Sequence, residues 1–166
     1  HSLLDGTIRV KGIAVYDIGC GGAALALAAA ESGASSVVAA DIDPTARRIA
    51  RENADHNRTS ITITGEDFLA APEKIAAGSV VFLADMFYEK GLAEKLVPLC
   101  ETCARRGCTV YIADGERKFL PRTDLVEIRK ERMAVSEEVE GVTERVAGLY
   151  RYGGESRSQE SEGKAG

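Results

Sequence analysis

Four acidic residues lie in or just after predicted β-strands, and they are the clearest candidates for functional side chains in this sequence. They are Asp17, Asp41, Asp67 and Asp85. In a parallel sheet the carboxyl ends of the strands meet at one edge, and open α/β folds bind their ligands there. We therefore expect the four carboxylates to share a ligand site rather than to serve only as helix caps.

The first of these acids precedes a glycine-rich turn that contains Gly19, Gly21 and Gly22 and runs into a strong helix former, residues 25–30. Glycines let the backbone turn tightly and let a ligand come close, and the free N–H groups at a helix start can face that ligand. The spacing of Gly19, Gly21 and Ala24 also fits the dinucleotide fingerprint with its last glycine relaxed to alanine. A nicotinamide-dependent Rossmann oxidoreductase is therefore one alternative.

The charge of Asp17 argues against a phosphate ligand at this turn. A carboxylate two residues before the first glycine would repel a pyrophosphate, whereas it suits a ligand with a positive charge. S-adenosylmethionine carries a sulfonium and an amino group and has no phosphates. Asp41 lies 22 residues after Gly19, which is close to the spacing of a carboxylate that accepts hydrogen bonds from ribose hydroxyls.

The elements that must position these residues alternate between strand and helix over most of the chain. Strands are expected at 13–18, 36–40, 60–64, 79–84 and 108–113, and helices at 22–32, 45–53 and 92–105. Asp43 and Pro44 mark the start of the second helix as its N-cap and first-turn proline. Two long strands, 125–140 and 142–152, follow with a turn at Glu140-Gly141. This order predicts an α/β fold, a Rossmann-like three-layer sandwich whose mostly parallel seven-strand sheet ends in an antiparallel hairpin.

The length and charge of the chain limit the classes of protein to which it can belong. Its 166 residues suit one domain, which we place at 1–152, and the segment 153–166, in which Ala165 is the one hydrophobic residue, predicts a disordered tail. A net charge of −5 argues against a surface that coats nucleic acid. The sequence has no apolar run that could span a membrane and no signal peptide. We expect a cytoplasmic protein with neither nucleic-acid nor membrane partners, or a mitochondrial matrix protein if a transit peptide has been lost.

The cysteines do not have the spacing of a metal site. Cys100 and Cys103 form a C-x-x-C pair, but no second such pair accompanies them, and His1 and His56 lie far away in the sequence. Zinc sites usually combine two such pairs or a pair with nearby histidines. We expect these cysteines to pack within a helix and predict no metal ion.

Three segments resemble one enzyme superfamily. Asp17-Ile18-Gly19-Cys20-Gly21 resembles the first motif of class I S-adenosylmethionine-dependent methyltransferases, and Asp41-Ile42-Asp43-Pro44 resembles the second-strand motif of the branch that includes the ribosomal-protein methyltransferases. Asp85-Met86-Phe87-Tyr88 is similar to the Asp-x-x-Tyr motif of the seven-strand protein lysine methyltransferases. The longer run 84–89 looks most like the enzymes that methylate lysines of the electron-transfer flavoprotein β-subunit. The predicted closing hairpin also matches this superfamily and not the dinucleotide dehydrogenases.

The resemblance implies N-methylation of a protein lysine, with the electron-transfer flavoprotein β-subunit or a ribosomal protein as the acceptor and S-adenosylmethionine as the cofactor. The implied cofactor-binding residues are Asp17 at the positive end, the backbone of Gly19, Gly21 and Gly22, Asp41 at the ribose hydroxyls, and Asp67 at the adenine amine with Phe68 nearby. The implied catalytic residues are Asp85 and Tyr88, which border the acceptor pocket and orient the amine. Phe87 is expected to pack in the core.

The chain departs from the family pattern in two places. Ala23 replaces the usual third glycine, a change that is tolerable if the backbone there keeps a negative φ. The family also carries substrate-shaping segments before the first strand, and only a dozen residues precede it here. We therefore expect the N-terminal substrate segment to be missing, and a non-catalytic cofactor-binding fragment is the second alternative.

Overall fold

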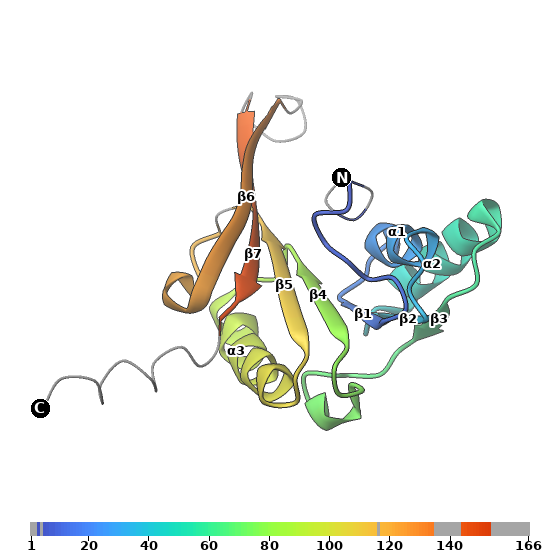
Figure 1. The fold of residues 1–166 in the computed structure, drawn as a ribbon, viewed down its shortest axis with the longest axis horizontal. Helices are drawn as coiled ribbons and strands as arrows, with labels where there is room; N and C mark the ends of the chain where they lie inside the picture. Colours follow the sequence, from blue (N-terminus) through green and yellow to red (C-terminus); the bar gives the residue numbers. More distant parts are fainter. Residues whose placement is uncertain (1–2, 4, 116, 135–143, 154–166) are drawn as a thin grey trace, which may run out of the picture.

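The computed structural model describes residues 3, 5–115, 117–134 and 144–153, and these residues form an α/β sandwich around one twisted sheet (Figure 1). The strands are β1 (Ala14–Ile18), β2 (Ser36–Ala40), β3 (Thr62–Thr64), β4 (Val80–Ala84), β5 (Thr109–Asp114), β6 (Leu125–Ala134) and β7 (Glu144–Tyr152). The helices are α1 (Ala24–Glu31), α2 (Pro44–Asn57) and α3 (Lys90–Arg105), with single 3₁₀ turns η1 (Pro72–Lys74) and η2 (Arg122–Asp124). The predicted alternation of strands and helices is confirmed.

The order of the strands creates the place where a ligand can bind. The sheet runs β3-β2-β1-β4-β5-β7-β6. Strands β1 to β5 pair in parallel, and β7 pairs antiparallel with both β5 and β6. The chain leaves β1 toward β2 and β3 and then returns to β4 on the other side of β1. Strand order therefore reverses between β1 and β4, and the crevice outside their carboxyl ends is the expected ligand site.

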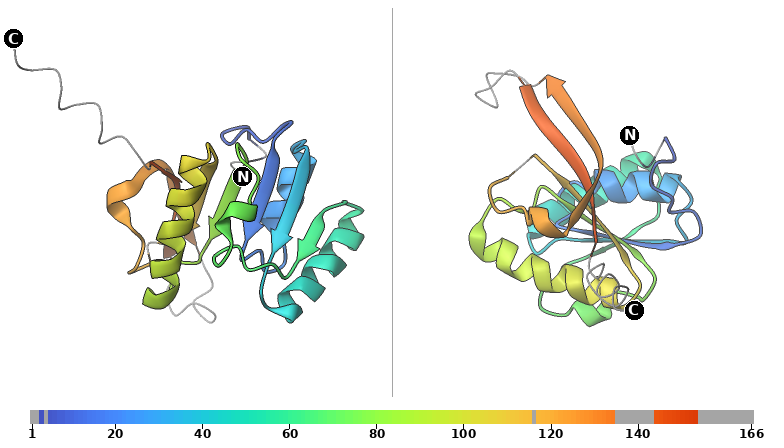
Figure 2. Two further views of the ribbon diagram at one scale, coloured as in Figure 1. Left: turned by 90° about the horizontal axis from the view of Figure 1, so that it is seen from below. Right: turned by 60° about the vertical axis from the view of Figure 1, so that its left-hand side comes forward.

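Helices cover both faces of the sheet, as the two views in Figure 2 show. Alternation along β1 separates two cores, because successive side chains point to opposite faces. Val15 packs with Ala26 and Ala29 of α1. Ile18 belongs to the other core, which includes Leu96 of α3. The expected three layers are confirmed, and Phe87 is fully buried in the core on the α3 side, as predicted.

The start of α2 follows the predicted capping chemistry. The Asp43 side chain accepts a hydrogen bond from the Thr45 N–H at 2.8 Å, and Pro44 occupies the first turn. The helix continues to Asn57, beyond the predicted end at residue 53, and stops where Arg58 adopts a left-handed backbone with φ +53°. Asp43 therefore orients α2 directly after the carboxyl end of β2.

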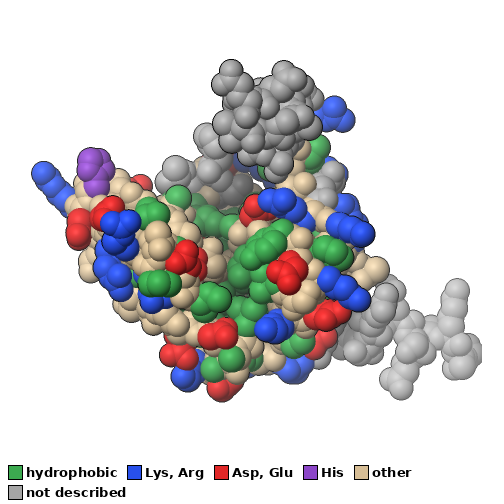
Figure 3. Space-filling model, turned by 180° about the vertical axis from the view of Figure 1, so that it is seen from behind, with side chains coloured by type: hydrophobic (Ala, Val, Ile, Leu, Met, Phe, Trp, Pro, Cys, Tyr) green, Lys and Arg blue, Asp and Glu red, His purple; other side chains and the backbone are tan. Residues whose placement is uncertain are grey.

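The C-terminal hairpin is confirmed by the pairing of β6 with β7 along their described lengths. The predicted turn at Glu140-Gly141 and the predicted tail, apart from Gly153, lie outside the described residues. The face in Figure 3 is hollowed between two lobes, with hydrophobic side chains in the hollow and charges of both signs interspersed on the lobes. None of the described helices is long and apolar enough to cross a membrane.

The C-x-x-C cysteines lie in α3, which also contains Pro98. Cys100 and Cys103 are buried, and burial raises the pKa of both thiols, that of Cys103 to about 12. They are therefore neutral packing groups. Within the described part of the chain, no cluster of three His, Cys, Asp or Glu side chains could hold a metal ion.

Candidate functional site

A pocket of about 310 Å³ lies at the carboxyl ends of the strands and is bounded by α3. Six of the nine predicted site residues line it: Gly19, Asp41, Asp67, Phe68, Asp85 and Tyr88. The other three, Asp17, Gly21 and Gly22, are not among its lining residues. Residues from β1, β2, β4 and the segment after β3 thus come together, as expected from the position of the acids at predicted strand ends.

Asp41 is held by the backbone on both sides of its carboxylate. Its Oδ2 accepts the Gly21 N–H at 3.0 Å, and its Oδ1 accepts the Asp43 N–H at 2.9 Å. The Nη1 of Arg47 in α2 donates to the carbonyls of Asp41 and Ile42, at 2.7 and 2.9 Å. Each carboxylate oxygen still has a second lone pair. Asp41 can therefore accept hydrogen bonds from a ligand diol without changing its orientation.

The glycine turn is bound to its neighbours through its backbone. The Gly19 N–H donates to the Ala40 carbonyl at 2.8 Å, and the Gly22 carbonyl accepts the Asn53 side-chain N–H at 2.8 Å. Gly19 has φ +70°, and a Cβ placed there would lie 2.8 Å from the Met86 sulfur. The left-handed φ favours glycine at this position, and a side chain there would also displace the flexible end of Met86. Gly22 connects the turn to α2.

The condition under which Ala23 would be easily tolerated is not met. The φ of Ala23 is +60°, in the left-handed region, rather than negative. A non-glycine residue there costs roughly 1–2 kcal/mol because Cβ approaches the following carbonyl. The turn imposes this conformation, since the Ala23 N–H donates to the Cys20 carbonyl at 2.7 Å and the side chain is fully buried. The tight turn thus persists without the third glycine.

Asp17 lies beneath the glycine turn rather than in the pocket wall. It shares a strand face with Val15, toward α1, and its Oδ2 accepts the Ala26 N–H at 3.1 Å. One of the N–H groups expected to face the ligand is therefore satisfied by Asp17. Burial raises the pKa of Asp17 to about 6, although the Ala26 N–H opposes that change. The role of Asp17 as a counter-charge for the cofactor stays a prediction.

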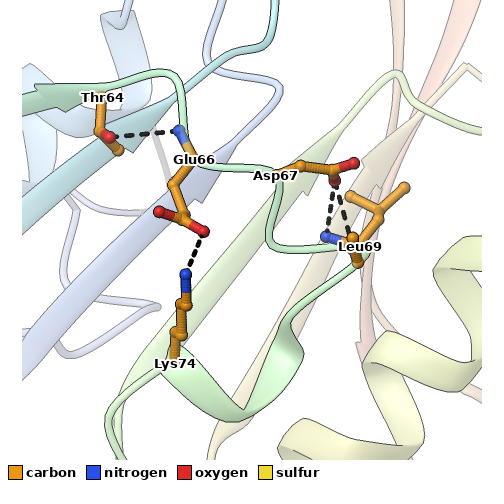
Figure 4. A network of polar contacts seen from close by, with 6 residues as sticks. Thr64, Glu66, Asp67, Leu69 and Lys74 are labelled. Atoms are coloured by element: carbon orange, nitrogen blue, oxygen red, sulfur yellow. Dashed lines mark hydrogen bonds and ion pairs between the residues drawn. The ribbon is translucent and has the colours of Figure 1, made fainter.

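The segment after β3 forms the second wall of the pocket, and Figure 4 shows its polar contacts. The Asp67 Oδ1 accepts the N–H groups of Leu69 and Ala70, at 3.0 and 3.3 Å. Both bonds end on one oxygen, and the other points away from the turn (Figure 4). Glu66 pairs with Lys74 of η1 at 2.6 Å. Asp67 can therefore cap its own turn and still accept a hydrogen bond from a ligand amine.

Two apolar side chains accompany this wall. Phe68 lines the pocket but is largely buried, and its ring meets that of Tyr16 edge to face at a centroid distance of 5.5 Å. Ile42 is 72% exposed and also lines the pocket, directly after Asp41. An exposed isoleucine between two polar residues suits contact with a flat apolar ring. Ile42 was missed in the sequence analysis, although its place after a strand-end acid is a usable signal.

The opposite wall begins at Asp85, whose backbone has the unusual φ of +54°. Its N–H donates to the Ala113 carbonyl at 2.7 Å, and its carboxylate is paired with Arg117. Tyr88 is 58% exposed and, with Lys95 of α3, completes this end of the pocket. Residues held in rare backbone conformations are common at functional sites, where the surrounding structure must maintain them. The sequence analysis missed Arg117, because nothing local connects it with Asp85.

The charges that line the pocket limit what it can bind. Asp41, Glu66, Asp67 and Asp85 contribute carboxylates, and Lys95 contributes the one amine among the lining residues. Glu66 is paired with Lys74 and Asp85 with Arg117, so the charges left for a ligand are those of Asp41 and Asp67. These two carboxylates would repel a pyrophosphate, whereas they would attract a cationic group. The arrangement therefore favours a positively charged nucleoside derivative without phosphates over a nicotinamide dinucleotide.

A second cavity of about 380 Å³ lies on the α1 side of the sheet. Its walls are mostly apolar, with Leu25, Phe82 and Leu149 among them, and none of the nine predicted residues lines it. Ligand sites combine apolar walls with a few convergent polar groups. The smaller pocket at the strand ends therefore remains the candidate site.

Comparison with known proteins identifies the family of this chain. Residues 2–104 match the family model described as ribosomal protein L11 methyltransferase (PrmA). The electron transfer flavoprotein beta subunit lysine methyltransferase of Danio rerio is 38% identical over 116 residues, which are 69% of this chain and 45% of that protein. This chain thus spans less than half the length of that relative.

Solved structures with the same fold include two methyltransferases of low sequence identity. The ribosomal protein L11 methylase of Lactobacillus delbrueckii subsp. bulgaricus has a TM-score of 0.56 at 22% identity, covering 88% of this chain and 72% of its own. The magnesium protoporphyrin IX methyltransferase of Synechocystis, solved with bound S-adenosylmethionine, has a TM-score of 0.62 at 16% identity, covering 89% and 74%. At these identities the likeness concerns the fold alone.

Proposed function

The chain belongs to the ribosomal protein L11 methyltransferase (PrmA) family, and from this premise we propose that it is an S-adenosylmethionine-dependent methyltransferase that N-methylates a protein lysine. One observation carries the proposal. Acidic side chains from three successive strand ends, those of β2, β3 and β4, line a single pocket together with Gly19, Phe68 and Tyr88. The electron-transfer flavoprotein β-subunit is the first acceptor to test, because the Danio rerio relative named for that activity matches 69% of this chain.

The residues present fit this cofactor at three points. Asp41 offers two fixed carboxylate oxygens for the ribose hydroxyls. Asp67 retains an oxygen for the adenine amine, and Ile42 and Phe68 provide apolar contact for the ring. The surplus of carboxylates suits the positive charges of the cofactor. Once bound, the cofactor supplies a methyl group on a positively charged sulfur.

The remaining task of the protein is to position the acceptor. Transfer forms a bond between the acceptor nitrogen and the methyl carbon, breaks the bond from that carbon to sulfur, and leaves the electron pair on sulfur. Placing the nitrogen in line with the methyl carbon and sulfur can lower the barrier by roughly 7–11 kcal/mol. Asp85 and Tyr88 border the same pocket as Asp41 and are exposed enough to meet an incoming side chain. We assign them to orienting the amine, which must lose a proton before it attacks.

The first test separates cofactor binding from methyl transfer. Calorimetry with S-adenosylmethionine is expected to show binding by the full chain, and the absence of binding would exclude the cofactor assignment. Intact-mass spectrometry then follows the recombinant electron-transfer flavoprotein β-subunit and ribosomal protein L11 after incubation with chain and cofactor, and fragmentation of their peptides locates any added methyl group. Methyl groups on a lysine of either acceptor support the proposal. Cofactor binding with no transfer to either acceptor would favour a non-catalytic cofactor-binding fragment.

The second test addresses the acceptor end. Asp85→Asn and Tyr88→Phe are each expected to lower kcat for the methylated acceptor roughly tenfold or more, because a misplaced nucleophile loses alignment. The affinity for S-adenosylmethionine, measured by calorimetry, should stay within about twofold of the unmodified chain, since no hydrogen bond or ion pair between described residues joins either side chain to Asp41 or Asp67. Equal losses of activity and cofactor affinity would instead place these residues in the cofactor site.

A further inference from the structure

The carboxylate of Asp85 is already bound to a cation in this structure. The Nε of Arg117 donates to Oδ1 at 2.8 Å, and its Nη2 donates to Oδ2 at 2.6 Å. Two parallel bonds of this kind are the most specific arrangement between a guanidinium and a carboxylate. The side chains are nevertheless 35% and 59% exposed, so water competes for the same donors and oxygens and limits the stability that even this bidentate pair contributes. The pair is therefore well defined in geometry and easy to exchange.

The backbone on both sides of this pair is anchored. The Oδ1 of Asp114, at the end of β5, accepts the Arg117 N–H at 2.6 Å. Asp114 is only 4% exposed, and its Oδ2 has no hydrogen-bond partner among the described residues. On the other side, the Asp85 N–H is bound to the Ala113 carbonyl. Arg117 is therefore held where its side chain reaches from the loop after β5 to the end of β4.

We propose that Arg117 occupies the position on Asp85 that the acceptor amine takes, so that Arg117 sets the affinity of the site for its acceptor. A lysine ammonium and a guanidinium are both cations with several N–H donors, and each can donate hydrogen bonds to the two carboxylate oxygens of Asp85. Asp85 also lines the pocket beside Tyr88, which is where the acceptor has to enter. The acceptor must therefore displace Arg117, at a small cost. This inference rests on the proposed function for the identity of the acceptor.

The exchange predicts a change in KM without a change in kcat. Arg117→Ala frees Asp85, so the KM for the electron-transfer flavoprotein β-subunit should fall about two- to fivefold, the range for losing an exposed competing pair. The kcat at saturating acceptor should stay the same. Arg105→Ala is the matched control, because it removes the same charge from a pair with Glu101 on α3, outside the residues that line the pocket. A raised KM, or a lowered kcat, in Arg117→Ala would overturn the proposal.

A binding experiment tests the exchange without methyl transfer. n-Butylammonium imitates the lysine side chain, and the Arg117 Nε–H signal in ¹⁵N-resolved NMR spectra of the full chain is identified by its loss in Arg117→Ala. Titration at neutral pH should move this signal toward that of a free arginine, and Asp85→Asn should abolish the change. A signal that does not move up to tens of millimolar butylammonium would overturn the exchange. This result is independent of whether the proposed acceptor is methylated.

Discussion

The two ends of the candidate pocket are held by different kinds of contact. At the end formed by β1 and β2, backbone N–H groups fix the carboxylate of Asp41, and Arg47 fixes the carbonyls beside it. At the end formed by β4, an exposed side-chain pair with Arg117 holds the carboxylate of Asp85. The backbone hydrogen bonds to Asp41 cannot break without unfolding the turn, whereas Asp85 can readily exchange Arg117 for another cation. The first end is thus preorganised for one cofactor, and the second can respond to an incoming side chain.

The two ends meet at Gly19 and Met86. Gly19 begins the glycine turn, and Met86 follows Asp85 at the end of β4. The space above Gly19 is filled by the end of the Met86 side chain. A methionine is flexible and can adapt to small changes of shape. A methyl group added at Gly19 would therefore displace Met86, and the effect on the pocket can be measured as a change in cofactor affinity.

The largest expected effect comes from removing the fixed carboxylate. Asp41→Ala should weaken S-adenosylmethionine binding by about 100-fold, because hydrogen bonds to a charged group contribute about 1.5–3 kcal/mol each and the anchor of Gly21 is lost too. Asp41→Asn keeps an acceptor oxygen and should lose less. Calorimetry gives both dissociation constants. An Asp41→Ala variant with unchanged affinity would show that the rigid end does not hold the cofactor.

A pH-dependent effect is expected at Asp17, beneath the rigid end. The folded state raises the pKa of Asp17 from 3.8 to about 6, so the folded protein binds this proton more tightly than the unfolded chain does. That stabilisation is fully present below pH 3.8 and is lost as the pH rises through 6. The unfolding free energy of Asp17→Asn, relative to the unmodified chain, should therefore rise by up to about 3 kcal/mol between pH 4 and pH 7. Urea unfolding at a series of pH values measures the difference, and a flat difference would contradict the burial argument.

The smallest expected effect separates backbone strain from contact with Met86. Gly19→Ala and Gly78→Ala both place a side chain at a left-handed φ, +70° and +74°, but a Cβ meets Met86 at Gly19 and nothing within 4 Å at Gly78. Both variants should lose roughly 1–2 kcal/mol of stability in thermal or urea unfolding. Only Gly19→Ala should also weaken cofactor binding, because it displaces Met86 into the pocket. Equal cofactor affinities in the two variants would show that the contact between residue 19 and Met86 does not affect cofactor binding.

Residues with local signals were predicted well. Asp43 and Pro44 start α2 as expected, and their capping interaction spans two residues. Asp41, Asp67 and Asp85 were placed at one sheet edge because parallel strands share the direction of their carboxyl ends. The left-handed φ of Ala23 was missed, since an alanine in the sequence does not indicate that conformation.

Residues that act through distant contacts had no such signal. Asn53 binds the Gly22 carbonyl across 31 residues, and Arg117 binds Asp85 across 32. The sequence also did not determine which side of the sheet Asp17 faces. Alternation places Val15 and Asp17 on the same side of a strand, but only the packing of α1 determines which side that is.

The sequence by itself determined the order of the elements, the acids at the strand ends and the family, because hydrophobic periodicity, glycine spacing and capping chemistry act over a few residues. The tertiary structure decided that Asp41 is fixed by backbone while Asp85 is held by Arg117, and that Asp17 is buried against α1. These contacts join segments that approach one another only when the sheet is assembled. The difference between the rigid and the exchangeable end of the pocket is therefore a property of the fold.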